Sequence, residues 1–341
     1  MASANNSKSN RMTYRFLGNS GLLVSKLSLG SWMDVSDKYT PETWYEMMKL
    51  AFENGINFFD NAELYGEGLA EKNMGAAIKK GIAEGTWSRE DLVITTKIFW
   101  GAKDFMAKRG PNEMGLSRKH IVEGTKASLK RLELEYVDVI FCHRPDRYTP
   151  IEETVRAMNF VINQGWAFYW GTSQWSAAEI IEACEIADRL GLVRPIVEQT
   201  IYSILDRNKV EFEYVDLYKK YKLGLTTWSP LAYEILTGKH SSGPTEGSRM
   251  DTLLFKWATP DFAERVAKAD VVGGGLKAQP RPQYTVESDE QAWTTSMWLQ
   301  SATSVPGCCS LQLQVAARHL KLVKVLVRES LLEAGLSLGR W

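Results

Sequence analysis

The sequence lacks the features that mark several specialised classes of protein. Only four of its 341 residues are cysteines (Cys142, Cys184, Cys308 and Cys309), and none has a CxxC spacing. This pattern indicates neither a disulfide framework nor a zinc or other metal site, and a reducing, cytoplasmic setting is the simplest interpretation. No run of about eighteen apolar residues is present, so we predict no membrane span and no direct membrane insertion.

The chain also carries no net formal charge at neutral pH. The 41 lysine and arginine residues balance 41 aspartate and glutamate residues. We therefore expect neither nucleic acid nor an anionic membrane surface as a partner. The N-terminal stretch MASANNSKSNRM is polar and has no apolar segment of the signal-peptide type, which predicts a disordered tail over residues 1–12. What the chain does contain, 44% apolar and 24% charged residues, is typical of a globular domain with a substantial core.

Helix signals recur along the chain. Thr40 and Pro41 suit the cap and the first position of a helix, Gly55 suits its end, and apolar residues between them recur at helical spacing. Thr149 and Ser176 each stand three residues before a glutamate, the capping box that starts a helix. The further predicted helices begin at Ser117, Thr149 and Ser176 and end near Leu132, Gly165 and Gly191.

Seven strand-like runs lie between the predicted helices. They are Leu27–Trp32, Asn57–Ala62, Leu92–Phe99, Val137–His143, Ala167–Gln174, Pro195–Ile201 and Leu225–Leu231. Each run but the last precedes a helix, and this alternation predicts a parallel α/β architecture. The doubly wound form normally has a glycine-rich turn after its first strand, where this chain reads Gly30-Ser31-Trp32. A later G-x-G-x-x-A match at Gly273 precedes two prolines that cannot open a helix, so we interpret it as chance.

Four polar residues, Asp60, Tyr65, Lys97 and His143, stand at or just after the ends of consecutive strand-like runs. In a parallel barrel the C-terminal ends of the strands converge on one face, so these residues would meet there. Side chains alternate between the two faces of a strand, and in three of these strands the last residue on one face is polar, which supports this placement. The three sets of residues that share a face are Ile56, Phe58 and Asp60; Val93, Thr95 and Lys97; and Val139, Phe141 and His143.

These residue types suit the reduction of a carbonyl group by hydride transfer. Tyr65 is the predicted general acid, and because the pKa of a free tyrosine is about 10, a nearby ammonium is needed to lower it. Lys97 would supply that ammonium, Asp60 would pair with Lys97, and His143 would position the carbonyl oxygen. Each residue also has a structural interpretation, as a packed tyrosine, a satisfied core histidine or a turn-capping aspartate. Their joint placement favours catalysis.

The residues around these positions resemble a known family. The resembling stretches are YRFLGNSGLLVSKLSLGSW, NGINFFDNAELYG, LVITTKIFWGAK, GLSRKHIVEGTKASLKRLELEYVDVIFCHRPD, TPIEETVRAMNFVINQGWAFYWGTSQWS and TWSPL. They are similar to the aldo-keto reductases, and most closely to the cytoplasmic beta subunits of voltage-gated potassium channels. The resemblance implies a (β/α)8 TIM barrel over residues 13–269 that opens with a β-hairpin at Thr13–Ser25. It implies a catalytic tetrad at Asp60, Tyr65, Lys97 and His143, where animal channel subunits typically have asparagine in place of His143.

The resemblance also implies that NADPH or NADP binds across the C-terminal face without a Rossmann fold. Ser173 and Gln199 match the residues that hold the nicotinamide carboxamide. Trp228 matches the ring that stacks against the nicotinamide, although plain packing explains this tryptophan equally well. The remaining matches are the turn residues Gly30, Ser31 and Trp32, the tetrad residue Asp60, the pyrophosphate-loop residues Ser229, Pro230 and Leu231, and the flap residues Lys239 and Arg249.

After about Ala269 the resemblance stops, and residues 270–341 form a divergent C-terminal segment. We do not find the family's last βα turn, which grips the 2′-phosphate, and only Leu311–Leu336 looks helical. We therefore expect an eighth βα unit that is atypical or missing, two open barrel edges, weak NADPH affinity and poor stability. The abrupt change favours an altered reading of the gene, a frame shift or retained intron, over a divergent segment that closes the barrel.

Two functions follow from the resemblance. The first is NADPH-dependent reduction of a small aldehyde or ketone, for which the tryptophans Trp32, Trp100 and Trp175 suggest an aromatic or apolar substrate. The second is regulation of a voltage-gated potassium channel by docking on its alpha subunit, with NADPH binding as a redox sensor. The two are compatible on one barrel, and the resemblance also suggests a homotetramer.

Overall fold

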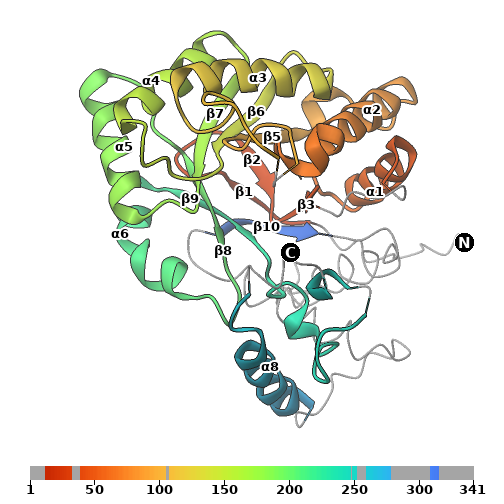
Figure 1. The fold of residues 1–341 in the computed structure, drawn as a ribbon. Helices are drawn as coiled ribbons and strands as arrows, with labels where there is room; N and C mark the ends of the chain where they lie inside the picture. The colour runs from red at the N-terminus through yellow and green to blue at the C-terminus, as the bar shows by residue number, and fades with distance from the viewer. Residues whose placement is uncertain are drawn as a thin grey trace, which may run out of the picture.

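The computed structural model describes residues 12–32, 39–104, 107–246, 248–251, 259–277 and 308–314. Its centre is a closed barrel of eight parallel strands with helices around the outside (Figure 1). The strands are β3 (Leu27–Gly30), β4 (Phe58–Asp60), β5 (Val93–Ile98), β6 (Val137–Cys142), β7 (Ala167–Ser173), β8 (Val197–Ile201), β9 (Gly224–Trp228) and β10 (Cys308–Gln314). All but β10 fall on the strand-like runs of the sequence, so the parallel α/β prediction is confirmed.

The helices follow the strands in the expected alternation. They are α1 (Pro41–Glu53), α2 (Leu69–Ala83), α3 (Arg118–Leu132), α4 (Ile151–Asn163), α5 (Ala177–Leu190), α6 (Val215–Tyr221) and α8 (Phe262–Lys277). Shorter helical turns are η1 (Tyr65–Gly68), η2 (Arg89–Asp91), η3 (Lys209–Glu213), η4 (Ile235–Thr237) and η5 (Arg249–Asp251).

The predicted helix caps form at three of four positions. The side chains of Thr40, Ser117 and Ser176 each accept a backbone N–H in the first turn of their helices. The capping box predicted at Thr149 is wrong, because its hydroxyl donates to Asp146 Oδ2 at 2.7 Å and α4 begins one residue later than a Thr149 cap requires.

The bottom of the barrel is covered by the predicted hairpin, in which β1 (Tyr14–Phe16) pairs antiparallel with β2 (Leu23–Ser25). Gly18 in its turn has a φ of +59°, and an added Cβ would lie 1.9 Å from the carbonyl oxygen of Ile196. Only glycine allows this close approach of hairpin to barrel. Met12, which we placed in the disordered tail, is buried and packs in the outer core, so that part of the tail prediction is wrong. Residues 1–11 of the predicted tail lie outside the described residues.

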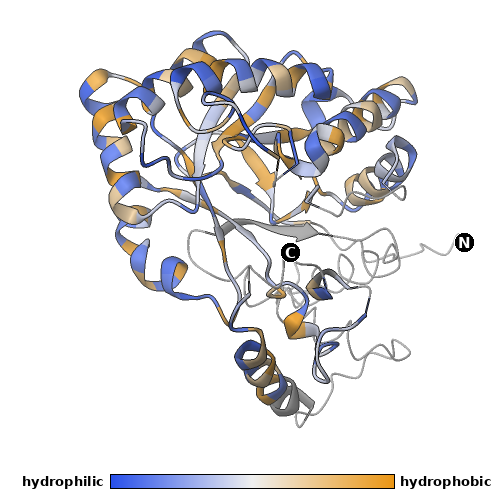
Figure 2. Ribbon diagram, in the orientation of Figure 1, coloured by the Kyte–Doolittle hydropathy of each residue, from blue (hydrophilic) through white to orange (hydrophobic). Residues whose placement is uncertain are grey.

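Apolar side chains form two layers separated by the barrel wall. The interior layer contains Phe58, Val93, Val139 and Phe141. The alternation of side chains along the strands predicts that these residues share one side with the tetrad residues. The outer layer lies between strands and helices, and Figure 2 shows apolar colour on some central strands and mixed colours on the covering helices. Ile56, which we expected inside, precedes β4 and packs in the outer layer.

The eighth strand comes from the divergent C-terminal segment. β10 pairs parallel with β3 (Leu311 beside Leu27) and with β9 (Leu311 beside Thr227), so the two open edges that we expected do not exist. The predicted helix Leu311–Leu336 is wrong over residues 311–314, and its remainder lies outside the described residues. The eighth βα unit is atypical, as predicted, because its strand comes from the segment that does not resemble the family; residues 315–341 lie outside the described residues.

The rest of that segment begins as a helix, because α8 continues through Lys277 and includes the glycine cluster at Gly273. The cluster is thus not a turn after a strand. Among the helices in the described ranges, none is long and apolar enough to cross a bilayer.

Candidate active site

The four predicted catalytic residues meet at the C-terminal end of the barrel. Lys97 Nζ forms a buried ion pair with Asp60 Oδ2 and donates hydrogen bonds to Asn61 O at 2.8 Å and to the Tyr65 hydroxyl at 3.2 Å. The Tyr65 ring lies edge-to-face with the His143 ring, with 5.8 Å between the centroids. Lys97 is 0% exposed and Asp60 is 1% exposed, so this ion pair is fully removed from water.

Neighbouring groups hold the Asp60 carboxylate in place. Thr95 Oγ1 donates to Asp60 Oδ1 at 2.9 Å, and Gln199 Nε2 donates to the same oxygen at 3.1 Å. With Lys97 on the other oxygen, both carboxylate oxygens are satisfied, as a buried charge requires. The carboxylate fixes where the lysine ammonium sits, and the ammonium in turn contacts Tyr65.

The loop that carries Tyr65 is tied to β5 by Glu63. Glu63 Oε1 accepts the backbone N–H groups of Phe99 at 2.7 Å and Gly101 at 2.8 Å and lies 3.1 Å from His120 Nε2. Because these contacts link the segment after β4 to the end of β5, they fix the distance between the tyrosine and the lysine. Sequence reasoning did not identify Glu63.

The pKa of Tyr65 is raised above its ordinary value of 10.0, mainly because the phenol is buried. The ammonium of Lys97 acts in the opposite direction and lowers that pKa, and Arg144 adds a smaller lowering effect. The sequence prediction therefore has the correct sign for Lys97, but burial outweighs it in the protein without a ligand.

His143 lies directly beyond β6, and its imidazole is 5% exposed. Burial, Arg144 and Lys97 hold the pKa of His143 well below 6.5, so the ring is neutral at physiological pH. Its Nδ1 atom has no hydrogen-bond partner among the described residues. A neutral imidazole carries one N–H donor and one acceptor, so it can donate to a carbonyl oxygen without giving up its proton.

Two of the predicted cofactor residues lie beside the tetrad. Ser173 is the last residue of β7 and pairs in register with Gln199 on β8, and both side chains are buried. The Gln199 amide already donates to Asp60, which leaves its oxygen as an acceptor. Ser173 Oγ lies 3.4 Å from a guanidinium nitrogen of Arg144.

The loop after β9 has an unusual backbone. Ser229, Ala232, Tyr233 and Glu234 have φ values of +55°, +47°, +56° and +75°, which non-glycine residues rarely adopt. Such strain concentrates at ligand-binding loops. Trp228 at the start of this loop is partly exposed, and its ring centroid lies 6.0 Å from that of Tyr233. Pro230 is buried and Leu231 is partly buried beside them.

The other predicted cofactor positions surround the same face. Gly30 ends β3, and the Ser31 N–H donates to the backbone oxygen of Asp60 at 2.9 Å. Trp32 lies edge-to-face with Tyr233, with centroids 6.3 Å apart. Lys239 forms an ion pair with Glu234.

Arg249 begins η5, and the structure describes only its backbone. The two other tryptophans of the suggested rim both pack against the outer core. Trp100 packs edge-to-face against Phe99, with ring centroids 4.7 Å apart, and Trp175 is buried in the outer core.

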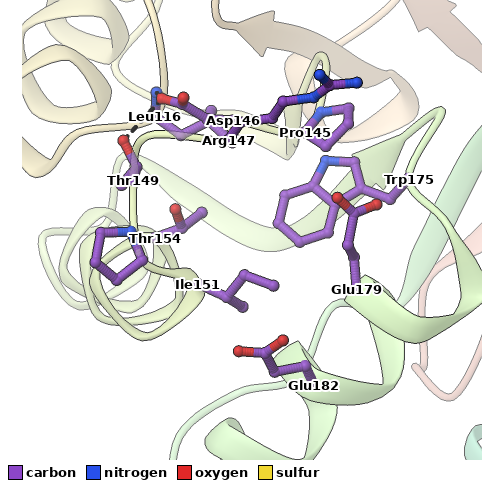
Figure 3. Close-up of a pocket in the computed structure, with 11 residues that line it drawn as sticks. Leu116, Pro145, Asp146, Arg147, Thr149, Ile151, Thr154, Trp175, Glu179 and Glu182 are labelled. Carbon is purple, nitrogen blue, oxygen red and sulfur yellow. Dashed lines mark hydrogen bonds between the residues drawn. The ribbon is translucent and has the colours of Figure 1, made fainter.

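A cavity of about 280 Å³ lies between the segment after β6 and the start of α5 (Figure 3). Asp146, Arg147 and Thr149 line one side, and Trp175, Glu179 and Glu182 line the other. The tetrad residues do not line it, so it is separate from the reacting centre.

Sequence reasoning also missed Arg144. Its Nη1 donates to the backbone oxygen of His143 at 2.5 Å and to Ser173 Oγ at 3.4 Å, which places a cation between a tetrad residue and a predicted cofactor residue. A basic residue immediately after a catalytic strand end was the available signal.

Comparisons with known proteins agree with this geometry. Residues 26–279 match the model of the aldo/keto reductase family. The chain is 57% identical over 232 residues to a "Probable voltage-gated potassium channel subunit beta" of Arabidopsis thaliana, covering 68% of each chain. It is 53% identical over 232 residues to a protein of the same description from Oryza sativa subsp. japonica, again covering 68% of each chain. With its barrel, its converging polar residues and these matches, the chain belongs to the aldo/keto reductase family, a family of oxidoreductases.

Proposed function

We propose that this protein is an NADPH-dependent reductase of aldehydes and ketones, with Tyr65 as the general acid. The observation that carries the proposal is the contact of Lys97 Nζ with both Asp60 and the Tyr65 hydroxyl, at 3.2 Å from the latter. This contact is what a proton-donating tyrosine needs, because the ammonium stabilises the tyrosinate that remains after the proton is given.

Each residue then has a defined task. Tyr65 donates its hydroxyl proton to the carbonyl oxygen as that oxygen becomes negative. Lys97 holds the resulting tyrosinate, and Asp60 holds Lys97. His143, neutral because of its lowered pKa, donates its N–H to the same carbonyl oxygen and orients it.

The residues present fit a nicotinamide cofactor. Two buried hydroxyl groups near the C-terminal ends of β3 and β9 have no partner among the described residues: Ser31 Oγ, and Thr226 Oγ1, which lies beside Gln199 in the register. Buried polar atoms require partners, so these positions suit a polar ligand. When bound, NADPH supplies the hydride. Ser173 and Gln199 would hold its carboxamide, Trp228 would stack on its ring, and Ser229–Leu231, Lys239 and Arg249 would hold its phosphates.

The test is NADPH oxidation with a panel of aldehydes by the wild type and by Tyr65→Phe. General-acid catalysis contributes about 10²- to 10⁴-fold, so Tyr65→Phe should lose turnover by at least that lower factor. Tyr148→Phe is the control, because Tyr148 is 97% exposed in the loop after β6. Equal turnover by Tyr65→Phe and the wild type would remove the general-acid role.

A second function is supported by the names of the relatives from Arabidopsis thaliana and Oryza sativa, which are described as probable potassium channel beta subunits. We propose that the protein also docks, in the cytoplasm and as a homotetramer, on the alpha subunit of a voltage-gated potassium channel. Co-purification with the cytoplasmic domain of a channel tests this function. Tyr65→Phe should still co-purify, because docking does not use the tetrad; no co-purification of the wild type would refute it.

A further inference from the structure

Arg144 has unused hydrogen-bonding capacity beside the catalytic residues. Its bonds to His143 O and Ser173 Oγ both use one nitrogen, Nη1. The Nε and Nη2 groups donate to no described residue, although the side chain is only partly exposed. A guanidinium presents five N–H donors in a planar fork, so most of the fork remains available.

Several other shielded arginines pair with carboxylates, whereas Arg109 donates to backbone oxygens such as Trp100 O and Asp104 O. Three such pairs are Arg89 with Asp138 at 2.8 Å, Arg131 with Glu71 at 2.6 Å and Arg265 with Asp206 at 2.5 Å. Among the described residues, no carboxylate lies within ion-pairing distance of Arg144. Among the described residues, Arg144 beside the tetrad therefore has neither a carboxylate partner like those three arginines nor the several backbone acceptors of Arg109.

The groups that interact electrostatically with Arg144 do not neutralise it. They are Tyr65, Tyr233 and Glu198. Burial raises the pKa of Glu198 to about 8, so this carboxyl is mostly protonated at pH 7. Burial also raises the pKa of Tyr65, and that of Tyr233 to about 12, so both phenols are neutral. A partly buried positive charge is left without an anion, which is costly unless a ligand supplies one.

We propose that Arg144 selects carbonyl substrates that carry a carboxylate, which binds the free edge of its guanidinium while the carbonyl group lies at Tyr65 and His143. This inference rests on the proposed reductase function and names its substrate class. The carbonyl carbon takes up a hydride from NADPH and the oxygen takes up the Tyr65 proton, giving an alcohol and NADP⁺, while the carboxylate is unchanged.

Aromatic residues near Arg144 indicate the shape of the substrate. Tyr233 interacts electrostatically with Arg144 and contacts the rings of Trp32 and Trp228 at centroid distances of 6.3 and 6.0 Å. An aromatic oxo acid would place its ring among these side chains and its carboxylate on the guanidinium.

The test compares two substrates of nearly identical shape, 4-carboxybenzaldehyde, which is anionic, and 4-nitrobenzaldehyde, which is neutral. In Arg144→Gln, kcat/KM for the carboxylate substrate should fall about 10- to 100-fold more than kcat/KM for the nitro substrate, the range expected for a charge-assisted hydrogen bond. Arg144→Lys, which keeps the charge, should recover part of the difference. Arg147→Gln is the matched control, because Arg147 is exposed in the same loop and lines the separate cavity of Figure 3.

Two kinetic results would overturn the inference, and a binding measurement decides it if there is no turnover. An equal loss on both substrates would show that Arg144 only supports His143. A change confined to the KM for NADPH would show that the anion is a cofactor phosphate. If the wild type reduces neither aldehyde, the proposed function fails, and calorimetric titration of 4-carboxybenzaldehyde then decides the role of Arg144. At least tenfold weaker binding to Arg144→Gln would support it, and equal binding would refute it.

Discussion

Replacing Lys97 with methionine tests both the stability and the chemistry of the tetrad. The change leaves the Asp60 carboxylate, 1% exposed, without its cation. Removing one partner of a buried ion pair destabilises a protein by about 3–5 kcal/mol. Thr95 and Gln199 would still donate hydrogen bonds to Asp60, so we expect a destabilisation at the lower end of this range, about 3 kcal/mol. Turnover should also fall by at least about 100-fold, because nothing would then stabilise the Tyr65 tyrosinate.

A double-mutant cycle separates the ion pair from simple packing. Asp60→Asn with Lys97→Met removes both charges, so the double variant should be more stable than the sum of the single changes predicts, by about 2 kcal/mol. Urea unfolding followed by circular dichroism measures this, and the midpoint of Lys97→Met should drop by about 1 M. The reasoning fails if Lys97→Met has the same urea midpoint as the wild type. It also fails if the free-energy changes of the two single variants simply add up in the double variant.

Three further predictions concern other parts of the barrel. The folded protein keeps Glu198 protonated up to about pH 8 whereas its ordinary pKa is 4.5, so the free energy of unfolding should fall as pH rises between these values. Glu198→Gln, which keeps an acceptor for the Thr172 hydroxyl, should therefore raise stability by about 2–4 kcal/mol at pH 8 and little at pH 4; equal thermal melting at pH 8 would contradict this. Cys142 and Cys184 are buried and their thiol pKa values are raised, so peptide mapping should find both unmodified after iodoacetamide treatment of the native protein, and rapid labelling would show that they are accessible. Leu311→Pro should lower the melting temperature sharply, because β10 pairs on both sides and proline removes a ladder donor; an unchanged melting curve would mean that β10 does not close the barrel.

The sequence predicts the repeating part of the fold well because its signals are local. Period-two alternation and strand-end polarity were enough to place Asp60, Lys97 and His143 at one end of the barrel, with Phe58 and Val93 inside. These patterns reflect the geometry of a single strand, and the closed barrel then brings the strand ends together.

The features that the sequence did not predict depend on tertiary contacts. The stretch LQLQ at Leu311–Gln314 alternates with period two, but the helix-like residues after it outweighed that signal, and its partners β3 and β9 are far away in the chain. One miss is local instead: Thr149 fits a capping box, but its hydroxyl donates to the carboxylate of Asp146, only three residues earlier in the chain. The pKa of Tyr65 depends on how deeply the phenol is buried, which spacing does not reveal.

The most direct test of the central claim is a titration of the full-length protein with NADPH, followed by tryptophan fluorescence. If the barrel closed by β10 binds the cofactor over the tetrad, fluorescence should be quenched with a saturable Kd in the micromolar range or tighter. Most of that signal should disappear in Trp228→Phe. Absence of saturable quenching, together with no binding by calorimetry, would contradict the proposal that this face of the barrel is a working reductase site.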